Sequence, residues 1–468
     1  MNSLRIIHLN DLHSHLERFP VIERFFAEKS VGLPDVLRFD LGDNVDRVHP
    51  LTEATEGQIN VALMNKLDLT GATLGNNEGL GLTHDMLSHL YNQAEFDILL
   101  SNISNMPFAQ GPKFIESSWG MRIGIIGLTA PYLAYLQAGW DIVDPLVCLD
   151  QLLPLDCDFT ILLSHLGKTV DEKIAKNYDI DLIIGSHTHH LFEHGVELHD
   201  TLLAAAGRYG EHIGEINLTF DQNNKVIASE ISTIATNTLK KEKSDALHIN
   251  SWELKGRKML QGKTVGELPY SLTNVYPDYN ASHFIAELLA RYGKVGACVF
   301  NTGLLVTEAL PNQLTLDDLH QFLPHSMRLV RLTMTGKVLK EVLREMLDVS
   351  AMLSGQNIRG MGFRGKQFGR LIFQGINFNR GKFYYRNTDV VDAESYSIVV
   401  PDQYLFAWYF PLLKKQEKAE ILFPYFLREI VANELKNEKM NKKRKGEESA
   451  KRRAVSYTHL RAHETRRH

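Results

Sequence analysis

The sequence predicts a layered α/β domain followed by a second, smaller domain, and three observations carry this prediction. Apolar, branched runs typical of buried strands alternate with helical spacing through the first half of the chain. Several of these runs end in Asp, Asn or His, mostly beside a glycine. The length of 468 residues also exceeds what one hydrophobic core usually covers, so we expect two domains.

Composition excludes several classes of protein. Hydrophobic residues make up 44% of the chain, but no run is long and apolar enough for a membrane span, so we expect no membrane partner. The first residues lack the basic and apolar regions of a secretory signal. The cysteines Cys148, Cys157 and Cys298 are scattered and odd in number, which argues against a disulfide framework or a thiolate zinc site. We therefore expect a cytoplasmic protein.

The net charge of −5 conceals an uneven distribution. Residues 436–468 hold twelve Lys and Arg against four Asp and Glu, so the remaining chain carries a net charge near −13. An acidic body offers no general surface for nucleic acid, which we exclude as a partner. We expect the tail to be disordered, with an RNA- or lipid-binding tail as the alternative. Its end, from Ser456, resembles cloning read-through and is left out of the fold prediction.

Strand and helix signals of the first domain follow one another in order. Strands are expected at 4–9, 36–41, 97–100, 122–127, 159–163 and 181–184, and helices at 19–28 and 59–66. The later runs at 202–205, 213–220 and 226–231 have no helical segment between them. We therefore expect the first domain to finish with antiparallel strands.

The pattern changes near Asn237. Residues 239–260 interleave charged and apolar side chains, which indicates a polar connecting helix. Beyond it we expect a helix at 282–292, a strand at 298–300 and a helix at 337–348. The predicted organisation is a first domain at 1–236, a connecting helix at 237–262, a second domain at 263–435 and the basic tail at 436–468.

The opening strand is the stretch around which the first domain is organised. Its apolar run, which begins at Leu4, ends abruptly in Asn10, Asp11 and His13. Asp11 and His13 are two residues apart, so at a strand end both side chains can project to one side. Carboxylate and imidazole are metal ligands rather than core residues. We interpret the pair as a two-ligand clip.

Four further segments place polar residues just beyond a predicted strand. They are Gly42-Asp43-Asn44, Gly75-Asn76-Asn77-Glu78-Gly79, Ser164-His165-Leu166-Gly167 and Gly185-Ser186-His187-Thr188-His189-His190. In open α/β sheets this edge is where ligands bind. A turn, a helix cap or an ordinary polar histidine explains any one of them alone. Five such segments in one domain together predict a metal site.

The five ordered blocks resemble the calcineurin-like metallophosphoesterases, and among them the 5'-nucleotidase and 2',3'-cyclic phosphodiesterase family. The Asn-Asn-Glu-Gly run at 76–79 is similar to that of a cytoplasmic Firmicutes subgroup. The resemblance implies a four-layer α/β/β/α sandwich with two divalent cations, joined to an α+β C-terminal nucleotidase domain.

Carried over position by position, the resemblance also implies the ligands. The first cation would be held by Asp11, His13, Asp43 and His189, and the second by Asp43, Asn76, His165 and His187. Asp43 would bridge the two. This donor set suits manganese, which we expect, and also zinc, iron or cobalt. Two such cations roughly 3.5–4 Å apart support in-line attack of a metal-bound hydroxide on a phosphate ester, without a protein nucleophile.

The polar neighbours of these ligands leave alternatives open. Asn10 is expected to shape the first loop. His15 and His190 either support ligands or are ordinary loop histidines. Glu78 either orients ligands or caps a helix.

The chain departs from the family directly after Asn76. Family members normally have a His there and an Asp three residues on, a pair that assists departure of the leaving group, whereas this chain has Asn77 and Leu80. Asn77 can donate a hydrogen bond but cannot titrate or carry charge. General acid assistance is typically worth about 10²–10⁴-fold. Either another group replaces it, with His84 as candidate or ordinary helix residue, or the substrate has a better leaving group, or the enzyme is slow.

The second domain resembles the family's C-terminal nucleotide-binding domain, with another departure. The usual Asn-Gly-Gly-Arg is Asn301-Thr302-Gly303-Leu304, so an arginine expected to bind substrate is missing. Asn301 and Gly303 remain candidate substrate contacts.

A glycine-rich loop at 359–365 could compensate for the missing arginine. Arg359 or Arg364 could contact a phosphate or carboxylate, and Phe363 could stack on a base. The opposing ring could come from Tyr409, or from Phe406 or Trp408. A flexible turn and core aromatic residues are the alternative interpretations.

Three functions follow from these residues. The leading one is two-metal hydrolysis of a small-molecule phosphate ester, a nucleotide above all, as in a 5'-nucleotidase. The second is a cyclic or dinucleotide phosphodiesterase or pyrophosphatase, which would tolerate Asn77 better. The third is a nucleotide-binding protein with little turnover, but the complete ligand set argues against it. The sequence does not fix the oligomeric state.

Overall fold

The computed structural model describes residues 2–268, 271–358, 360, 362–416 and 418–437. The chain divides into two compact units, Met1–Met259 and Leu260–His468, and the division falls inside the segment predicted as a connecting helix. Among the described residues, no helix combines the length and the apolar character needed to cross a membrane. Cys148, Cys157 and Cys298 are free thiols.

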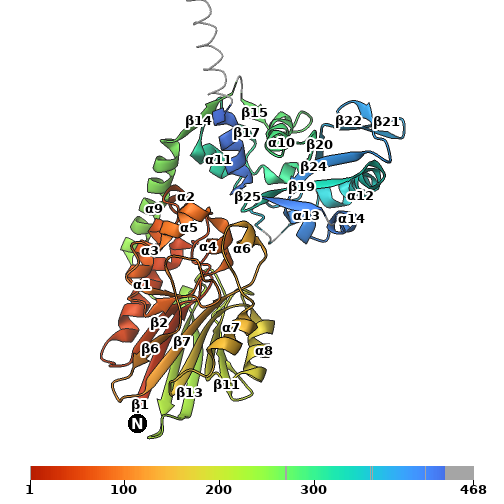
Figure 1. The fold of residues 1–468 in the computed structure, drawn as a ribbon. Helices are drawn as coiled ribbons and strands as arrows, with labels where there is room; N and C mark the ends of the chain where they lie inside the picture. Colours follow the sequence, from red (N-terminus) through yellow and green to blue (C-terminus); the bar gives the residue numbers. More distant parts are fainter. Residues whose placement is uncertain (1, 269–270, 359, 361, 417, 438–468) are drawn as a thin grey trace, which may run out of the picture. The chain divides into compact units, whose positions relative to one another are not determined.

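Two β-sheets form the centre of the first unit (Figure 1). The seven-stranded sheet runs in the order β13 (Val226–Ala235), β12 (His212–Phe220), β1 (Asn2–Leu9), β2 (Val36–Asp40), β3 (Gly71–Ala72), β4 (Asp97–Leu99) and β5 (Ala109–Gln110). The six-stranded sheet runs in the order β10 (Val196–Leu198), β11 (Thr201–Ala204), β9 (Leu182–Gly185), β8 (Phe159–His165), β7 (Arg122–Thr129) and β6 (Lys113–Glu116).

The helices of this unit were only partly expected from the sequence. They are α1 (Phe19–Ser30), α2 (Pro50–Ala54), α3 (Gln58–Asn65), α4 (Asn76–Gly81), α5 (His84–Leu90), α6 (Ala134–Gln137), α7 (Pro145–Leu152), α8 (Lys168–Asn177) and α9 (Lys243–Gln261). The 3₁₀ turns are η1 (Leu16–Arg18) and η2 (Thr236–Thr238). Helices α1 and α3 agree with the segments predicted at 19–28 and 59–66.

Alternation along the strands produces the layers. In β1, Ile6 points into the core between the two sheets, where it joins Ile161 of β8. The next residue, Ile7, points to the other face and packs against α1 through Phe19. The outer face of the six-stranded sheet is covered by α7 and α8, whose Ile174 is part of that core. Successive strand residues thus serve different cores, and the result is the expected α/β/β/α sandwich.

Parallel pairing brings the ends of the central strands to one edge. Strands β1, β2, β3 and β4 pair in parallel, as do β7, β8 and β9. Strands β12 and β13 are antiparallel to their neighbours, as expected. The expectation was wrong for β11, which is parallel to β9. The reason is β10, a short strand without a clear sequence signal, which pairs antiparallel with β11 and reverses the chain where a helix would otherwise do so.

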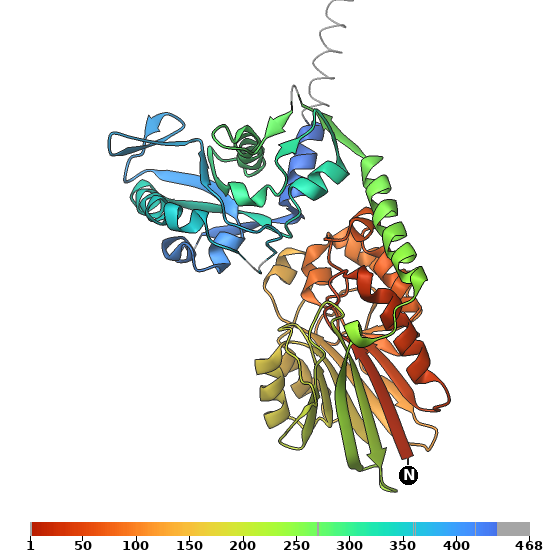
Figure 2. The same cartoon turned by 180° about the vertical axis from the view of Figure 1, so that it is seen from behind.

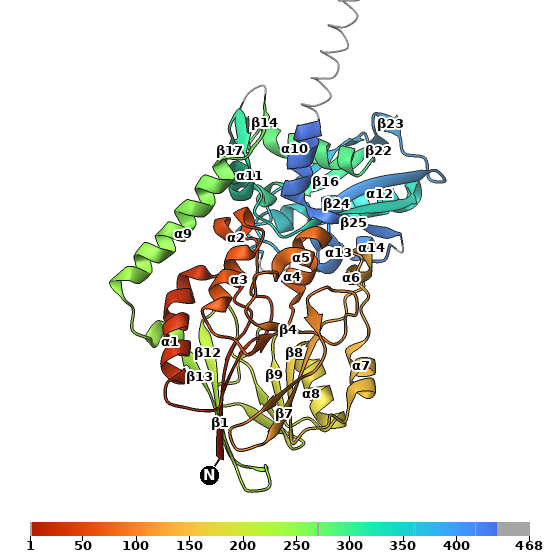
Figure 3. The same ribbon diagram turned by 60° about the vertical axis from the view of Figure 1, so that its left-hand side comes forward.

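Helix α9 closes the first unit and begins at Lys243, later than the predicted 239 (Figure 3). Its Trp252 ring lies 6.4 Å from the ring of Phe19 in α1. Gly256 permits close packing, because a Cβ at this position would collide with the main chain of Leu51 in α2. The greater part of the predicted connecting helix therefore packs on the first unit.

The second unit is built on a five-stranded sheet (Figure 2). Its order is β20 (Leu371–Gln374), β16 (Ala297–Asn301), β24 (Ser395–Pro401), β19 (Arg328–Thr335) and β25 (Ala419–Phe426), in which the β16–β24 pair is parallel and the other pairs are antiparallel. Small sheets are formed by β14 (Thr264–Glu267) with β18 (Gln313–Thr315), by β15 (Leu272–Thr273) with β17 (Ala309–Leu310), and by β21 (Ile376–Asn379), β22 (Lys382–Tyr385) and β23 (Thr388–Asp389).

One core joins the helices of the second unit to its sheet. The helices are α10 (Asn280–Tyr292), α11 (Leu316–Phe322), α12 (Gly336–Ser354), α13 (Gln403–Phe406), α14 (Pro411–Lys414) and a helix over 427–437, with the 3₁₀ turn η3 (Thr302–Leu304). Ile285 of α10 and Leu343 of α12 pack with Val299 of β16. The predicted elements at 282–292, 298–300 and 337–348 lie within α10, β16 and α12. Most of the predicted basic tail lies outside the described residues.

Candidate metal centre

All seven predicted metal ligands stand at the ends of parallel strands in the first unit. Asp11 and His13 follow β1, Asp43 follows β2, Asn76 follows β3, His165 ends β8, and His187 and His189 follow β9. Since parallel strands end at the same edge of a sheet, these segments converge. The polar segments that follow successive strands in the sequence therefore lie close together at one edge in the structure.

The backbone of the ligand loops adopts a conformation that side chains other than glycine rarely take. The φ angles are 46° at Asp11, 48° at His13, 52° at Asp43, 73° at His187 and 55° at His189. Such residues persist only where surrounding contacts hold them, and they gather at functional sites. Here the main-chain N–H of His13 donates to the carbonyl of Asp43 over 2.8 Å, which joins the first two loops.

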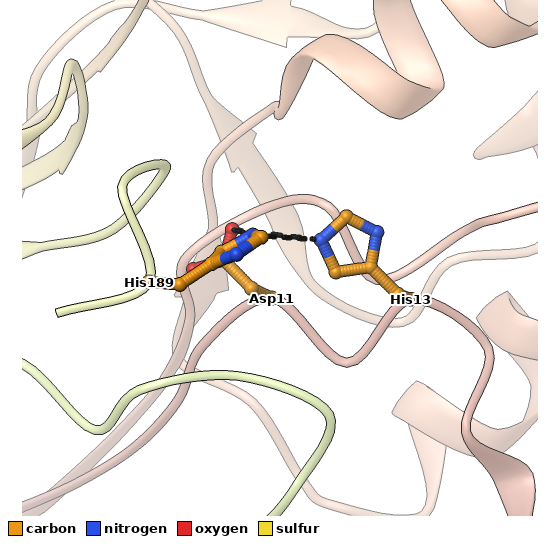
Figure 4. Close-up of side chains that lie close together, drawn as sticks. All are labelled: Asp11, His13 and His189. Atoms are coloured by element: carbon orange, nitrogen blue, oxygen red, sulfur yellow. Dashed lines mark hydrogen bonds and ion pairs between the residues drawn. The ribbon is translucent and has the colours of Figure 1, made fainter. Parts of the chain in front are cut away.

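One cluster consists of Asp11, His13 and His189, whose side chains point toward one another (Figure 4). The Nε2 atoms of the two histidines lie 3.1 Å apart. Asp11 Oδ1 lies 3.9 Å from Nε2 of His13 and 3.6 Å from Nε2 of His189. The three ligand atoms fall within 4.8 Å of one another, close enough to hold one cation.

A second cluster shares Asp11 and adds Asp43 and His165. His165 Nε2 lies 3.5 Å from Oδ1 of Asp43, while its Nδ1 donates to the carbonyl of Leu41 over 2.7 Å. That hydrogen bond leaves a lone pair on Nε2. The other carboxylate oxygen, Oδ2, lies 3.7 Å from Nε2 of His13. Asp43 therefore directs one oxygen toward each cluster.

Several buried lone-pair atoms converge at this edge without a hydrogen-bond partner. In the described part of the chain these are Oδ1 of Asp11, Oδ1 of Asn76 and Nε2 of His165. Buried polar atoms in native proteins are nearly always paired, so three unpaired acceptors at one edge require an explanation. A divalent cation would accept all three lone pairs, and the carboxylate, amide and imidazole donors suit one. The residues present thus fit a metal centre.

The charged groups of the two clusters shift one another's pKa strongly. Burial alone would lower the pKa of His165, but the Asp43 carboxylate outweighs it and raises that pKa to about 10, so a cation that binds Nε2 must displace a proton from it. Burial alone would raise the pKa of Asp43, yet His165 holds it well below its usual range. Burial lowers the pKa of His187 and of His189 to about 4. Four imidazoles, of His13, His165, His187 and His189, and the carboxylates of Asp11 and Asp43 form a polar centre rather than a hydrophobic core.

His187 lies beside the second cluster rather than within it. Its Nε2 is 2.9 Å from the hydroxyl of Tyr132, and its ring centroid is 5.2 Å from that of His165. Its main-chain N–H donates to Oδ2 of Asp11 over 3.3 Å, and the hydroxyl of Ser186 donates to the same oxygen. The segment after β9 is thus attached to the first loop as well as carrying two predicted ligands.

The two candidate catalytic residues lie in different surroundings. Asn77 is the second residue of α4. Its main-chain N–H donates to Oδ1 of Asp43 over 2.7 Å, and its Nδ2 lies 2.6 Å from Nδ1 of His13. His84 is exposed and stacks on Trp140 at a centroid distance of 4.0 Å. The structure therefore places Asn77 at the centre, whereas the contact of His84 is that of an ordinary helix residue.

Glu78 and Asn10 hold the loops in place. The buried carboxylate of Glu78 accepts main-chain hydrogen bonds from Asp43, Val45 and Gly75 over 3.0, 2.7 and 3.2 Å, so it caps α4 and also fixes the Asp43 loop. The sequence left open whether Glu78 caps a helix or orients a ligand loop, and its hydrogen bonds do both. Asn10 donates to the carbonyl of Gly185 over 2.6 Å and thereby joins the first loop to the segment after β9.

Sequence reasoning missed two further residues at this edge, Tyr132 and Arg208. Tyr132 follows β7, and Arg208 follows β11. The guanidinium of Arg208 lies 3.2 Å from Nδ1 of His189 and stacks over the ring of Tyr209. Both residues stand just beyond strand ends, which was the available signal, but neither sits in a run of metal-capable residues.

The structure gives most of the predicted substrate contacts of the second unit other partners. Asn301 is buried: its Nδ2 donates to the carbonyl of Phe368 over 2.6 Å and its Oδ1 accepts from Tyr404 over 2.8 Å. A Cβ at Gly303 would collide with the carbonyl of Gln367, which explains that glycine by packing. These contacts hold the segment after β16 in place, and a contact of Asn301 or Gly303 with substrate stays a prediction.

The candidate stacking rings differ in exposure. Tyr409 is 4% exposed and packs on Phe368, and Phe363 is 5% exposed. Phe406 and Trp408, in contrast, are 58% and 59% exposed. Tyr409 is thus a core residue, as the alternative interpretation held, and the accessible rings of that segment are its neighbours. Arg359 lies outside the described residues.

His325 connects the two segments that were predicted to bind substrate. Its Nε2 donates to the carbonyl of Leu304 over 2.7 Å, and its Nδ1 accepts from the main-chain N–H of Arg364 over 2.9 Å. The ring of Phe363 stacks on it at 5.0 Å. Burial lowers the pKa of His325 to about 3, so the imidazole is neutral where it makes both bonds.

Comparison with known proteins agrees with this division. Residues 4–191 match the calcineurin-like phosphoesterase family, and residues 263–405 match the 5'-nucleotidase C-terminal domain. An uncharacterized metallophosphoesterase of Bacillus subtilis (strain 168), YunD, is 31% identical over 457 residues, which cover 92% of this chain and 98% of that protein. A human 5'-nucleotidase is 25% identical over 310 residues, 54% of this chain and 53% of that protein.

Among solved structures, the NAD nucleotidase of Haemophilus influenzae has a similar fold. The TM-score is 0.62 at 17% identity, and the match covers 93% of this chain and 96% of that one.

The neutral state of buried His325 makes the stability of the second unit depend on pH. Its folded pKa, about 3, lies below the ordinary value of 6.5, so the unfolded chain binds a proton that the folded chain does not. Stability is expected to fall as pH drops below about 6.5, by up to about 1.4 kcal/mol per pH unit. Hydrogen exchange of residues 301–304 and 362–365 in the full chain, between pH 7.5 and 4.5, measures this.

His325→Gln retains a donor without a titrating ring, so it should lower stability at pH 7.5 and flatten the slope. His283→Gln, at an exposed histidine of the same unit, is the matched control. An unchanged slope in His325→Gln would show that another group is responsible.

Proposed function

The chain belongs to the calcineurin-like phosphoesterases and carries a 5'-nucleotidase C-terminal domain, and from this premise we propose that it hydrolyses a small nucleotide with the help of two divalent cations. Members of this family are hydrolases of phosphate esters, and they use a dinuclear metal centre. The chain is therefore an enzyme of that class. Its substrate and the identity of its metal, for which we favour manganese, are the parts proposed.

The observation that carries the proposal is the pair of clusters with Asp43 between them. The first cation would be held by Asp11, His13, Asp43 and His189, and the second by Asp43, Asn76, His165 and His187. The opposed oxygens of Asp43, at 3.5 Å from His165 and 3.7 Å from His13, support a bridging role. The unpaired oxygen of Asn76 supports its place in the second set.

When bound, two divalent cations lower the pKa of a water molecule and neutralise the non-bridging oxygens of a phosphoryl group. The chain's own residues then bind and orient the ester. The amide of Asn77, held beside His13, can donate a hydrogen bond to a phosphoryl oxygen. Arg208 brings a fixed positive charge to the same edge, which favours an anionic substrate.

A second candidate, hydrolysis of a cyclic or dinucleotide diester or of a phosphoanhydride, is favoured by Asn77. An amide cannot give a proton to a departing alkoxide, so esters with poor leaving groups lose the assistance that the family's histidine would supply. The phosphate leaving group of an anhydride departs more easily without a proton from the enzyme. The buried state of Asn301 and the presence of Leu304 leave a third candidate, a nucleotide-binding protein with little turnover.

Chromatography of the products from a panel of substrates separates these candidates, because cleavage of a diester or a dinucleotide gives a nucleotide product and no free phosphate. The protein is chelated, reloaded with Mn²⁺ and assayed on nucleoside 5'-monophosphates, nucleoside diphosphates, 2',3'-cyclic monophosphates and a dinucleotide. We expect turnover of at least one class that is lost on chelation. Asp43→Asn, which alters the proposed bridge, controls for contaminating phosphatases. Two bound ions without conversion of any substrate would refute both enzymatic candidates and favour the binding protein.

Replacing Asn77 with His tests the role of the leaving group. The new imidazole can supply a proton, so turnover of monophosphates should rise by about 10-fold or more, while turnover of anhydrides changes little. Steady-state kinetics with both substrate classes measure the difference. Asn77→Gln changes the side chain without adding a titrating group and is the matched control. An equal change in both classes would contradict the role of the leaving group.

A further inference from the structure

We propose that Asp46 is a positioning residue that holds the imidazole of His13 in the tautomer able to ligate a cation. The inference rests on the proposed two-cation function. Asp46 stands three residues after Asp43, in the loop that follows β2, and it is 4% exposed.

Asp46 is attached to the His13 segment twice. Its carboxylate oxygen Oδ2 lies 3.4 Å from Nδ1 of His13. Its main-chain N–H donates to the hydroxyl of Ser14, the residue after His13, over 2.9 Å. The hydroxyl of Ser14 is itself held by Asn60, whose Nδ2 lies 3.1 Å away. The carboxylate and the imidazole are therefore kept together by main-chain and side-chain contacts.

The opposite nitrogen of the same ring faces the ligand cluster. Nε2 of His13 lies 3.1 Å from Nε2 of His189 and 3.7 Å from Oδ2 of Asp43. A neutral imidazole has one N–H and one lone pair, so Nε2 can ligate only when the proton is on Nδ1. That proton needs an acceptor. A buried carboxylate at Nδ1, an acceptor only when ionised, favours this tautomer.

The amide of Asn77, the other group at Nδ1, does not favour one tautomer of His13 over the other. Nδ2 of Asn77 lies 2.6 Å from the same nitrogen and in this orientation would donate to a lone pair there. A half-turn of the amide brings Oδ1 to that position as an acceptor, so the amide is compatible with either tautomer. Of the two groups at Nδ1, only Asp46 favours the tautomer that carries its proton on Nδ1. Carboxylates that orient ligating histidines are typically worth about 10- to 100-fold in metal affinity. We expect an effect of that size at the cation held by His13.

Metal binding tests the inference without reference to turnover. The metal-free full chain is titrated with Mn²⁺ by calorimetry, and Co²⁺ absorption reports the ligand set. In Asp46→Ala we expect two ions still to bind, one of them about 10- to 100-fold more weakly. Asp46→Asn, similar in shape but no longer acceptor-only, should lie between. Asp179→Asn, at an exposed aspartate of the same unit, should match the wild type.

Moving the carboxylate to the other neighbour of Nδ1 gives a second, sharper test. In Asp46→Ala/Asn77→Asp an acceptor again faces Nδ1 of His13, so the lost affinity should be largely recovered. Wild-type affinity in both single variants of Asp46 would overturn the proposal. Loss of one ion altogether, with a changed Co²⁺ spectrum, would overturn it in favour of Asp46 as a direct ligand. Absence of bound metal in the wild type would instead refute the proposed function.

Discussion

Buried lone pairs without protein partners are the constraint on which the first unit depends. Oδ1 of Asp11, Oδ1 of Asn76 and Nε2 of His165 gather at one sheet edge, where leaving such atoms unpaired costs free energy. The surrounding loops are nevertheless held in rarely populated conformations that keep these atoms together. The proposed cations would compensate this cost, and the hydrogen bonds of Glu78 and Asn10 hold the same loops in place.

The two units differ in how many of the family's metal-binding and substrate-binding residues they keep. In the first, all seven predicted ligands are present, and Asn77, one of its two departures, lies within hydrogen-bonding distance of a proposed ligand. In the second, an arginine that the family has at the substrate is replaced by Leu304, and the side chain of Asn301 is hydrogen-bonded within the unit. Specificity is therefore more open to change than metal chemistry, because new substrate contacts can replace old ones while a cation tolerates few changes of ligand.

The sequence was informative where local pattern and function coincide. A buried run that ends in Asp11 and His13 marks both a strand and its ligands, and the same holds at Asp43 and His165. Other features arise only from tertiary structure. Strand β11 became parallel because a short strand reversed the chain, and the burial of Tyr409 depends on neighbours distant in sequence. Asp46 was not singled out from the sequence, and its proposed role rests on one contact, with Nδ1 of His13.

Anomalous diffraction from crystals grown with Mn²⁺ tests the two-cation centre most directly, because it locates each ion and counts them. We expect two peaks per chain, one among Asp11, His13 and His189 and one beside Asp43 and His165, with Asp43 touching both. A single peak, or peaks away from these residues, would contradict the two-cation centre. It would also mean that something other than a pair of cations compensates the unpaired buried atoms.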